Sequence, residues 1–163
     1  METAFSEIRV EDDDVLLSRF EILPGRSFKI APIGEFTQIY RTGRGFLSGE
    51  FSKHITKFIN ACKPDDRWSL LMTDTFLLNC LTEDDGDYER SSFLAECVFE
   101  KLLPGVPAII FPSTRWLGCL NFVIRSDNFW ENWKIHSVLR GQGKHLACGY
   151  YSFTNIRHVT HIV

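Results

Sequence analysis

Apolar residues recur along the chain with two different spacings, and these predict both helices and strands. From Ser48 onward the spacing is three and four residues, the period of one helical face, and Ser48 is itself a suitable N-cap. The predicted buried face comprises Phe51, Ile55, Phe58, Ile59 and Cys62. Because a proline cannot continue the helix, the run at 63–66, which contains Pro64, is predicted to end it.

A second amphipathic helix is predicted over about 89–103, and Pro104 and Gly105 follow it as terminators. Its inward positions are Phe93, Leu94, Cys97, Val98 and Leu102. An acidic, glycine-containing loop is expected before it, over 82–88. This loop lacks the ligand alternation and terminal glutamate of an EF-hand, so it predicts a solvated loop and no metal site.

Short apolar and β-branched runs predict strands at 37–40, 68–72, 106–111 and 121–124, and one or two more within 148–163. Residues 1–16 are acidic at their centre and are expected to begin as a loosely held arm. Few strands alternate with helices, so a doubly wound parallel sheet is disfavoured. The pattern favours a single compact α+β domain with two main helices and a mixed or antiparallel sheet.

Composition narrows the class of protein. The 163 residues correspond to one domain over 1–163, and 44% hydrophobic with 24% charged residues excludes wholesale disorder. A net charge of −3 disfavours a nucleic-acid partner, and no apolar run is long enough to cross a membrane. Five scattered cysteines without a C-x-x-C pair disfavour structural zinc and disulfides. We therefore expect a cytoplasmic location with reduced thiols and no metal.

Several polar residues stand where predicted elements begin or end. Arg26 follows Gly25, Tyr40 closes a strand, and Glu50 lies in the first turn of a helix. Ser113 follows an apolar strand, and Asn121 opens the next one. A guanidinium binds phosphates, a tyrosine ring stacks on a flat base, and a carboxylate stabilises an oxocarbenium-like centre. Together these residue types suit a pyrophosphate-bearing ligand whose far end undergoes nucleophilic substitution.

Residues 25–126 resemble the RES family, which is named for an arginine, a glutamate and a serine. The matching segments are 39–42, 47–51 with His54, 88–96, 105–113, Gly118 and 121–123. Gly25 and Arg26 match the family's arginine, 14 residues before Tyr40, and Arg41 or Arg44 is the alternative.

The resemblance implies a fold similar to ADP-ribosyltransferases and NAD⁺ as the substrate. RES proteins are toxins that cleave the nicotinamide–ribose bond by hydrolysis or phosphorolysis, or transfer ADP-ribose to a protein acceptor, and a cognate antitoxin neutralises them. By resemblance, Arg26 or Arg41 together with Ser113 holds the phosphates and the nicotinamide-side ribose, and Asn121 helps to bind NAD⁺. Tyr40 then stacks on the nicotinamide. Glu50 stabilises the ribosyl cation and orients the attacking group.

Two histidine motifs offer a different enzymatic hypothesis. His54 and His158 each begin an H-x-T-x-hydrophobic unit, 104 residues apart, which resembles the paired motif of two-histidine phosphoesterases acting on 2′,3′-cyclic phosphates. Those enzymes need both units on adjacent strands. The first unit here lies on the predicted amphipathic helix, which disfavours this hypothesis.

A third hypothesis is a protein-interaction module without catalysis. Trp116, Trp130 and Trp133 lie in or beside predicted loops, and exposed tryptophans there favour a partner site. The segment 128–133 concentrates these aromatic side chains.

Overall fold

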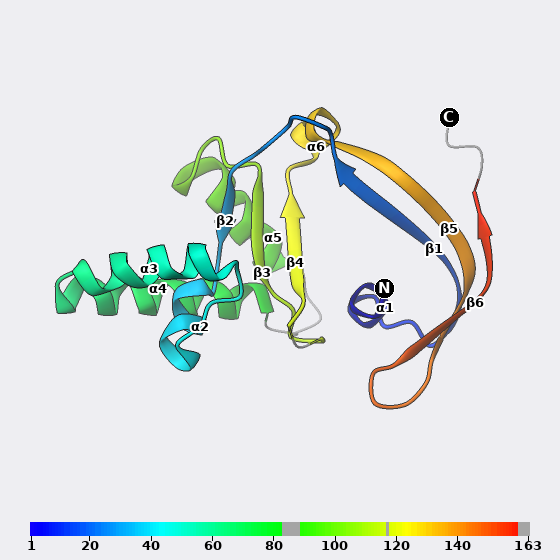
Figure 1. Cartoon of the computed structure of the whole chain (residues 1–163), viewed down its shortest axis with the longest axis horizontal. Coiled ribbons are helices and arrows are strands. Elements are labelled where there is room, and N and C mark those ends of the chain that lie inside the picture. Colours follow the sequence, from blue (N-terminus) through cyan, green and yellow to red (C-terminus); the bar gives the residue numbers. More distant parts are fainter. Residues whose placement is uncertain (83–88, 117, 160–163) are drawn as a thin grey trace. The chain divides into compact units, whose positions relative to one another are not determined.

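The computed structural model describes residues 1–82, 89–116 and 118–159. Helices and strands are both present, which confirms the predicted mixed α and β class (Figure 1). The backbone contacts divide the chain into two compact units. Unit 1 contains residues 1–28, 115–119 and 126–163, and unit 2 contains residues 29–114 and 120–125.

Unit 1 is built on an antiparallel sheet in the order β1-β5-β6. Its elements are α1 (Glu2–Glu7), β1 (Asp12–Ile22), α6 (Ser126–Asn132), β5 (Trp133–His145) and β6 (Tyr151–His158). β6 confirms the strand predicted in the aromatic tail. The last residues of that predicted tail, 160–163, lie outside the described residues.

Residues 1–16 form α1 and the start of β1, so the expectation of a loosely held arm is wrong. Phe5 is fully buried, and its ring meets those of Tyr151 and Phe153 edge-on. The acids of β1 face bases and an amide on β5. Asp14 accepts hydrogen bonds from Arg140, and Asp12 accepts from Gln142 at 2.8 Å and lies 3.4 Å from Lys144. These partners are about 130 residues away in the sequence, where local patterning cannot reveal them.

Unit 2 packs helices against a small mixed sheet in the order β2-β3-β4, with β2 parallel and β4 antiparallel to β3 (Figure 1). The buried strand β3 passes through its core. The strands are β2 (Ile30–Pro32), β3 (Ala108–Pro112) and β4 (Leu120–Ile124). The helices are α2 (Glu35–Thr42), α3 (Gly49–Ala61), α4 (Pro64–Thr82), α5 (Glu89–Cys97) and the π-helical turn η1 (Val98–Leu102).

The helices predicted from Ser48 and over 89–103 and the strands predicted at 106–111 and 121–124 are present as α3, α5 with η1, β3 and β4. Their predicted inward faces are only partly correct, because Phe51, Phe58, Phe93 and Leu102 are exposed. The Ser48 hydroxyl caps α3 by accepting a hydrogen bond from the Phe51 amide at 3.4 Å. The predicted second helix forms as α5 continued by η1, and it ends before Pro104. Of the acidic loop predicted over 82–88, only Thr82 is described, and it ends α4.

Two predicted strands are helices instead. The run 37–40 lies in α2, which two glycines with positive φ, Gly34 and Gly43, bound at its ends. The run 68–72 lies within α4, whose first residue is Pro64. A proline is well tolerated in the first turn of a helix, so the residue that prevents α3 from continuing also begins α4. Short apolar runs are compatible with a strand or a helix, and both of these runs are helical in the structure.

Acid should weaken the pairing of β1 with β5. Hydrogen bonds from Arg140 lower the pKa of Asp14, and those from Gln142 and Lys144 lower the pKa of Asp12. A carboxylate with a lowered folded-state pKa stabilises the fold above its unfolded pKa, about 3.9, and that stability is lost as the pH falls through the folded value. We expect amide exchange in β1 and β5 to accelerate below about pH 4.

Asp14→Asn should show a weaker acid response than the wild type in the same exchange experiment. Asp13→Asn is the matched control, because the Asp13 carboxylate accepts a hydrogen bond from the Glu11 amide and its backbone partner on β5, Gly143, has no side chain to pair with. An unchanged acid response in Asp14→Asn would contradict this assignment.

Candidate functional site

Tyr40 lies on α2 and opens onto a pocket of about 230 Å³, here called the Tyr40 pocket. Its side chain is 63% exposed, and its ring meets Trp68 of α4 edge-on at 5.7 Å. Residues of α2, α3 and α4 line the pocket: Phe36, Ile39, Tyr40, Thr56, Ile59, Asn60, Arg67, Trp68 and Leu71. The tyrosine predicted to close a strand therefore stands on a helix, beside a cavity with aromatic walls.

The one arginine that lines the Tyr40 pocket already has partners. The Arg67 guanidinium donates to the carbonyl oxygens of Ile59 at 3.1 Å, Asn60 at 3.4 Å and Cys62 at 3.3 Å. These are among the last carbonyls of α3 and the residue after it, which have no partner within the helix. Arg67 thus closes the end of α3, and a ligand in this pocket would have to use other polar groups.

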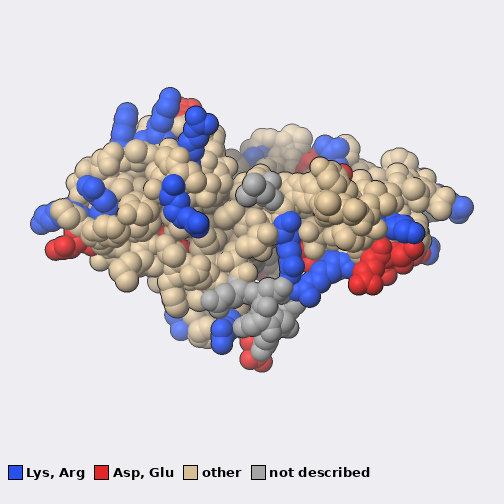
Figure 2. All heavy atoms as spheres, turned by 90° about the horizontal axis from the view of Figure 1, so that it is seen from below, with Lys and Arg blue, Asp and Glu red and all other residues tan. Residues whose placement is uncertain are grey.

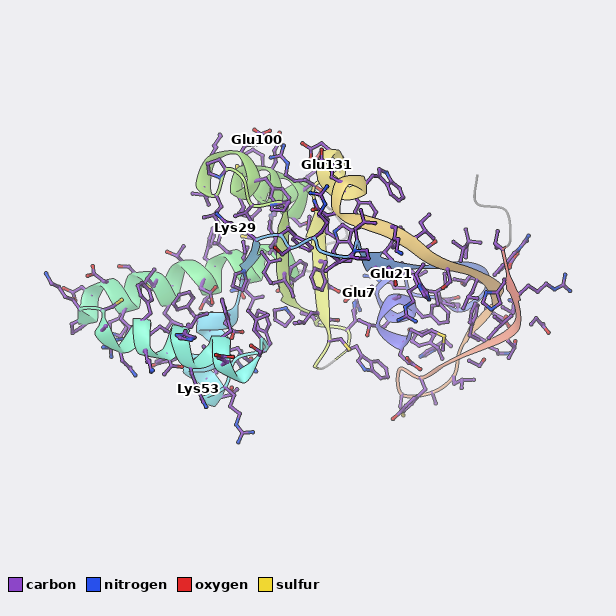
Figure 3. The ribbon with its side chains drawn as sticks, turned by 45° about the horizontal axis from the view of Figure 1, so that its top comes forward. Glu7, Glu21, Lys29, Lys53, Glu100 and Glu131 are labelled. Carbon is purple, nitrogen blue, oxygen red and sulfur yellow. The ribbon has the colours of Figure 1, made fainter. Side chains whose placement is uncertain are left out.

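A polar stripe on α3, here called the α3 stripe, runs from the Tyr40 pocket to Glu50. Its members Glu50, Lys53, Lys57 and Asn60 are spaced three, four and three residues apart, which places them on one helical face. All four are exposed, and Asn60 also lines the pocket. Lys53 projects away from the helices (Figure 3). At 1.5 Å per residue the stripe is about 15 Å long.

The surroundings of the α3 stripe are basic although the whole chain is acidic. Positions 41–63 contain five bases and one acid, Glu50, whereas the chain carries a net charge of −3. The face drawn in Figure 2 shows Lys and Arg side chains over the helical part of unit 2. Within the described residues Glu50 forms no ion pair. An anion would therefore meet a locally favourable potential here, and Glu50 is available as a carboxylate.

The other predicted site residues do not line the Tyr40 pocket. Ser113 directly follows β3 and is buried, and Asn121 lies in β4 opposite Phe111. Neither lines the Tyr40 pocket. Arg26 belongs to unit 1, where its amide donates to the Leu23 carbonyl in the turn after β1. Tyr40 lies on α2 next to Arg41, and Glu50 lies in the first turn of α3, about 15 Å along the helix from Asn60.

Sequence reasoning missed a buried carboxylate at the start of α2. Asp74 of α4 is 7% exposed, and its oxygens accept hydrogen bonds from the Gly34 amide at 2.7 Å and the Thr37 amide at 2.8 Å. The Thr37 hydroxyl donates to the same carboxylate at 2.8 Å. Gly34 has no side chain to cap α2, so Asp74 supplies the cap from another helix.

A second buried carboxylate, Glu35, holds the loop between α2 and α3. Its oxygens accept hydrogen bonds from the Phe46 amide at 2.8 Å, the Leu47 amide at 3.3 Å and the Ser52 hydroxyl at 2.8 Å. A Cβ at Gly45 would lie 1.8 Å from Glu35 Oε1, so only glycine fits beside it. The glycine-rich stretch 43–49 is the one sequence signal for this arrangement. Because both carboxylates already accept three hydrogen bonds, their role is structural.

The histidine hypothesis loses its geometric basis in this structure. His54 lies on α3 and His158 ends β6 in unit 1, whereas the phosphoesterase arrangement requires two strands. Thr160 and His161 of the second motif lie outside the described residues. Within the part of the chain that the structure describes, no group of three or more His, Cys, Asp or Glu side chains could hold a metal ion.

The tryptophans of the interaction-module hypothesis lie in aromatic clusters of unit 1. Trp130 is 62% exposed and contacts the rings of Phe20 and Phe129, and Trp133 stacks on Phe129 with an interplanar angle of 7°. Trp116 meets Tyr150 edge-on. Nothing in these contacts identifies a partner, so the hypothesis of a binding module stays a prediction.

Comparisons with protein-family models, with curated proteins and with solved structures found no match to this chain. The resemblance to the RES family and to the ADP-ribosyltransferase fold therefore stays a prediction that depends on the residues given above. Among the described helices, none combines the length and the apolar character needed to cross a membrane.

Replacing Asp74 should destabilise unit 2 strongly. Asp74→Ala leaves the Gly34 and Thr37 amides and the Thr37 hydroxyl without their buried acceptor, and we expect the free energy of unfolding to fall by about 2–4 kcal/mol. Asp66→Ala, at an exposed position in the first turn of α4, should cost less than about 1 kcal/mol. Chemical denaturation of both variants measures this, and equal losses would contradict the capping role of Asp74.

Proposed function

We propose that the protein binds NAD⁺ along the α3 stripe and cleaves its nicotinamide–ribose bond, as the resemblance to RES enzymes implies. The observation that carries this proposal is the continuity of the Tyr40 pocket with the α3 stripe through Asn60. An aromatic pocket, two lysines and an accessible carboxylate follow one another in the order that a base, a pyrophosphate and a reacting ribose require.

One base of the dinucleotide would occupy the Tyr40 pocket. Its volume of about 230 Å³ is below the range of about 300–1,000 Å³ for pockets that enclose whole small ligands, so only one end of NAD⁺ fits inside. Tyr40 and Trp68 supply aromatic surface for stacking, and the Asn60 amide supplies a donor and an acceptor. The Thr56 hydroxyl already donates to the Ser52 carbonyl at 2.8 Å, which leaves it as an acceptor.

The middle of the dinucleotide would lie over Lys53 and Lys57. Both ammonium groups are exposed, so their attraction for the pyrophosphate is modest and screened by salt. These two lysines would make the phosphate contact that the resemblance assigns to Arg26 or Arg41 together with Ser113. It also assigns the adenine to Tyr40, because Glu50, the carboxylate proposed for the chemistry, stands at the opposite end of the α3 stripe.

Glu50 would stabilise the positive charge that develops on the ribose as the bond to nicotinamide breaks and its electron pair leaves with the nicotinamide. Water then forms the new bond at the ribose carbon and releases its proton, so NAD⁺ and water give ADP-ribose, nicotinamide and a proton. Solvent reaches Glu50 freely, which favours water over a protein acceptor. A cognate antitoxin that covers the α3 stripe would block the reaction.

Tyr40→Ala should weaken substrate binding. The loss of a stacked base costs about 1–3 kcal/mol, so we expect KM for NAD⁺ to rise at least fivefold in a nicotinamide-release assay, while Tyr40→Phe stays near the wild type. Tyr150→Ala is the matched control, because Tyr150 is 61% exposed and also meets a tryptophan edge-on. Equal KM values for Tyr40→Ala and Tyr150→Ala would contradict the proposed role of the Tyr40 pocket.

Glu50→Gln should remove most of the chemistry. The carboxylate acts on a charge that develops only in the transition state, so kcat should fall about 100-fold or more with little change in KM. Glu100→Gln, at an exposed position on η1, should keep the wild-type rate. Absence of nicotinamide release by the wild type, or full release by Glu50→Gln, would overturn the proposed reaction.

A further inference from the structure

A larger cavity of unit 2, here called the β2-edge pocket, lies beside the edge strand β2 and has a volume of about 650 Å³. Its walls come from β2, α2, α3, α4, η1 and the residues after η1, and they include Ile30, Phe51, Leu70, Leu77, Leu102 and Val106. It shares only Phe36 with the Tyr40 pocket. Its size is in the usual range for a site that encloses a small molecule.

The polar groups in the walls of the β2-edge pocket are mostly engaged within the protein. Both oxygens of Asp74 accept hydrogen bonds from α2, and the Ser69 hydroxyl donates to the Asp65 carbonyl at 3.0 Å. The remaining walls are largely hydrocarbon. A ligand whose body is apolar would therefore gain from burial there, whereas a pyrophosphate would lose hydration without compensation.

One cation, Lys29, lines the β2-edge pocket at the start of β2 (Figure 3). Its side chain is exposed and forms no ion pair with the described residues. An anionic group at one end of a ligand would meet this ammonium while the rest of the ligand lies in the pocket. The charge and the apolar walls together select an amphiphile with a single acidic end.

The edge of β2 does not suit an added peptide strand. The Ile33 amide donates to the Ile110 carbonyl across the β2–β3 pair, so the nitrogen of its neighbour Pro32 faces the opposite, open edge. Proline has no N–H, so a strand added there would lose a ladder hydrogen bond. This favours a small molecule over a peptide as the occupant.

The π-helical turn η1 adds an independent observation. Val98 and Leu102, its first and last residues, both line the β2-edge pocket. π-helical turns are rare and occur frequently at functional sites. We propose that the β2-edge pocket binds a medium-chain carboxylate, with the hydrocarbon chain inside and the carboxylate beside Lys29.

Calorimetric titration of the full chain with decanoate and with decanol tests this proposal. We expect saturable one-to-one binding of decanoate. Lys29→Gln should weaken decanoate binding about fivefold, the upper end for a solvent-accessible ion pair, and leave decanol binding unchanged. Lys63→Gln, another exposed lysine of unit 2 outside the pocket, should behave as the wild type.

A variant that fills the pocket distinguishes binding in the pocket from binding elsewhere on the surface. Thr73 is exposed on α4 and lines the pocket, so Thr73→Trp should fill it and reduce binding of both probes at least tenfold. Leu103→Trp serves as a second blocking variant if the first fails to fold. Nicotinamide release by either variant reports on the proposed enzyme separately, because neither residue belongs to the Tyr40 pocket or the α3 stripe.

The proposal is overturned if the wild type gives no saturable heat with decanoate, or if a folded blocking variant binds as the wild type does. It is also overturned if Lys29→Gln affects the acid and the alcohol equally. A wild-type dimer that Thr73→Trp dissociates would assign the pocket to a second copy of the chain, and that result would contradict a small-molecule occupant.

Discussion

The arrangement of helices in unit 2 depends on the carboxylate of Asp74. α2 begins at a glycine that has no capping side chain, so its first amides need an acceptor from elsewhere in the fold. Asp74 supplies that acceptor from the middle of α4, and burial makes the three hydrogen bonds obligatory, because a buried carboxylate without partners is very costly. Fixing α2 against α4 in this way places Tyr40 beside Trp68 and so creates the Tyr40 pocket.

Glu35 positions α3 in a similar way, because it too is a buried carboxylate that accepts hydrogen bonds from another segment. Its carboxylate binds the amides of Phe46 and Leu47 and the hydroxyl of Ser52, and so connects the start of α2 to the first turn of α3. The inward face of α3 is thereby set, and Glu50, Lys53 and Lys57 are left on the outer one. The α3 stripe is thus a consequence of two buried acids that take no part in the proposed chemistry themselves. Asp74 and Glu35 therefore stabilise unit 2 and also position the helices that carry the proposed site.

Local signals located α3, α5, β3, β4 and β6, and they missed β1 and β5, which pair with each other across more than 100 residues of sequence. The helical period and Ser48 located α3, and apolar runs located β3 and β4. The strand predicted at 68–72 failed because its residues belong to a 19-residue helix, in which a short apolar run carries no distinct period. The acidic start of β1 and the role of Asp74 depend on partners about 126 and 40 residues away, which a single sequence does not pair. Of the residues in the proposed site, Tyr40 and Glu50 were predicted from the sequence. Lys53 and Lys57 were not predicted, and they were recognised from their position on the same face of α3 as Glu50.

Hydrogen exchange with and without NAD⁺, followed peptide by peptide on the full chain, tests most directly the claim that α3 carries the nucleotide. The account predicts slower exchange in residues 40–44 and 53–60, which border the Tyr40 pocket and the α3 stripe, and unchanged exchange in β1 and β5 of unit 1. Unchanged exchange along α3 at saturating NAD⁺, or protection confined to unit 1, would contradict it.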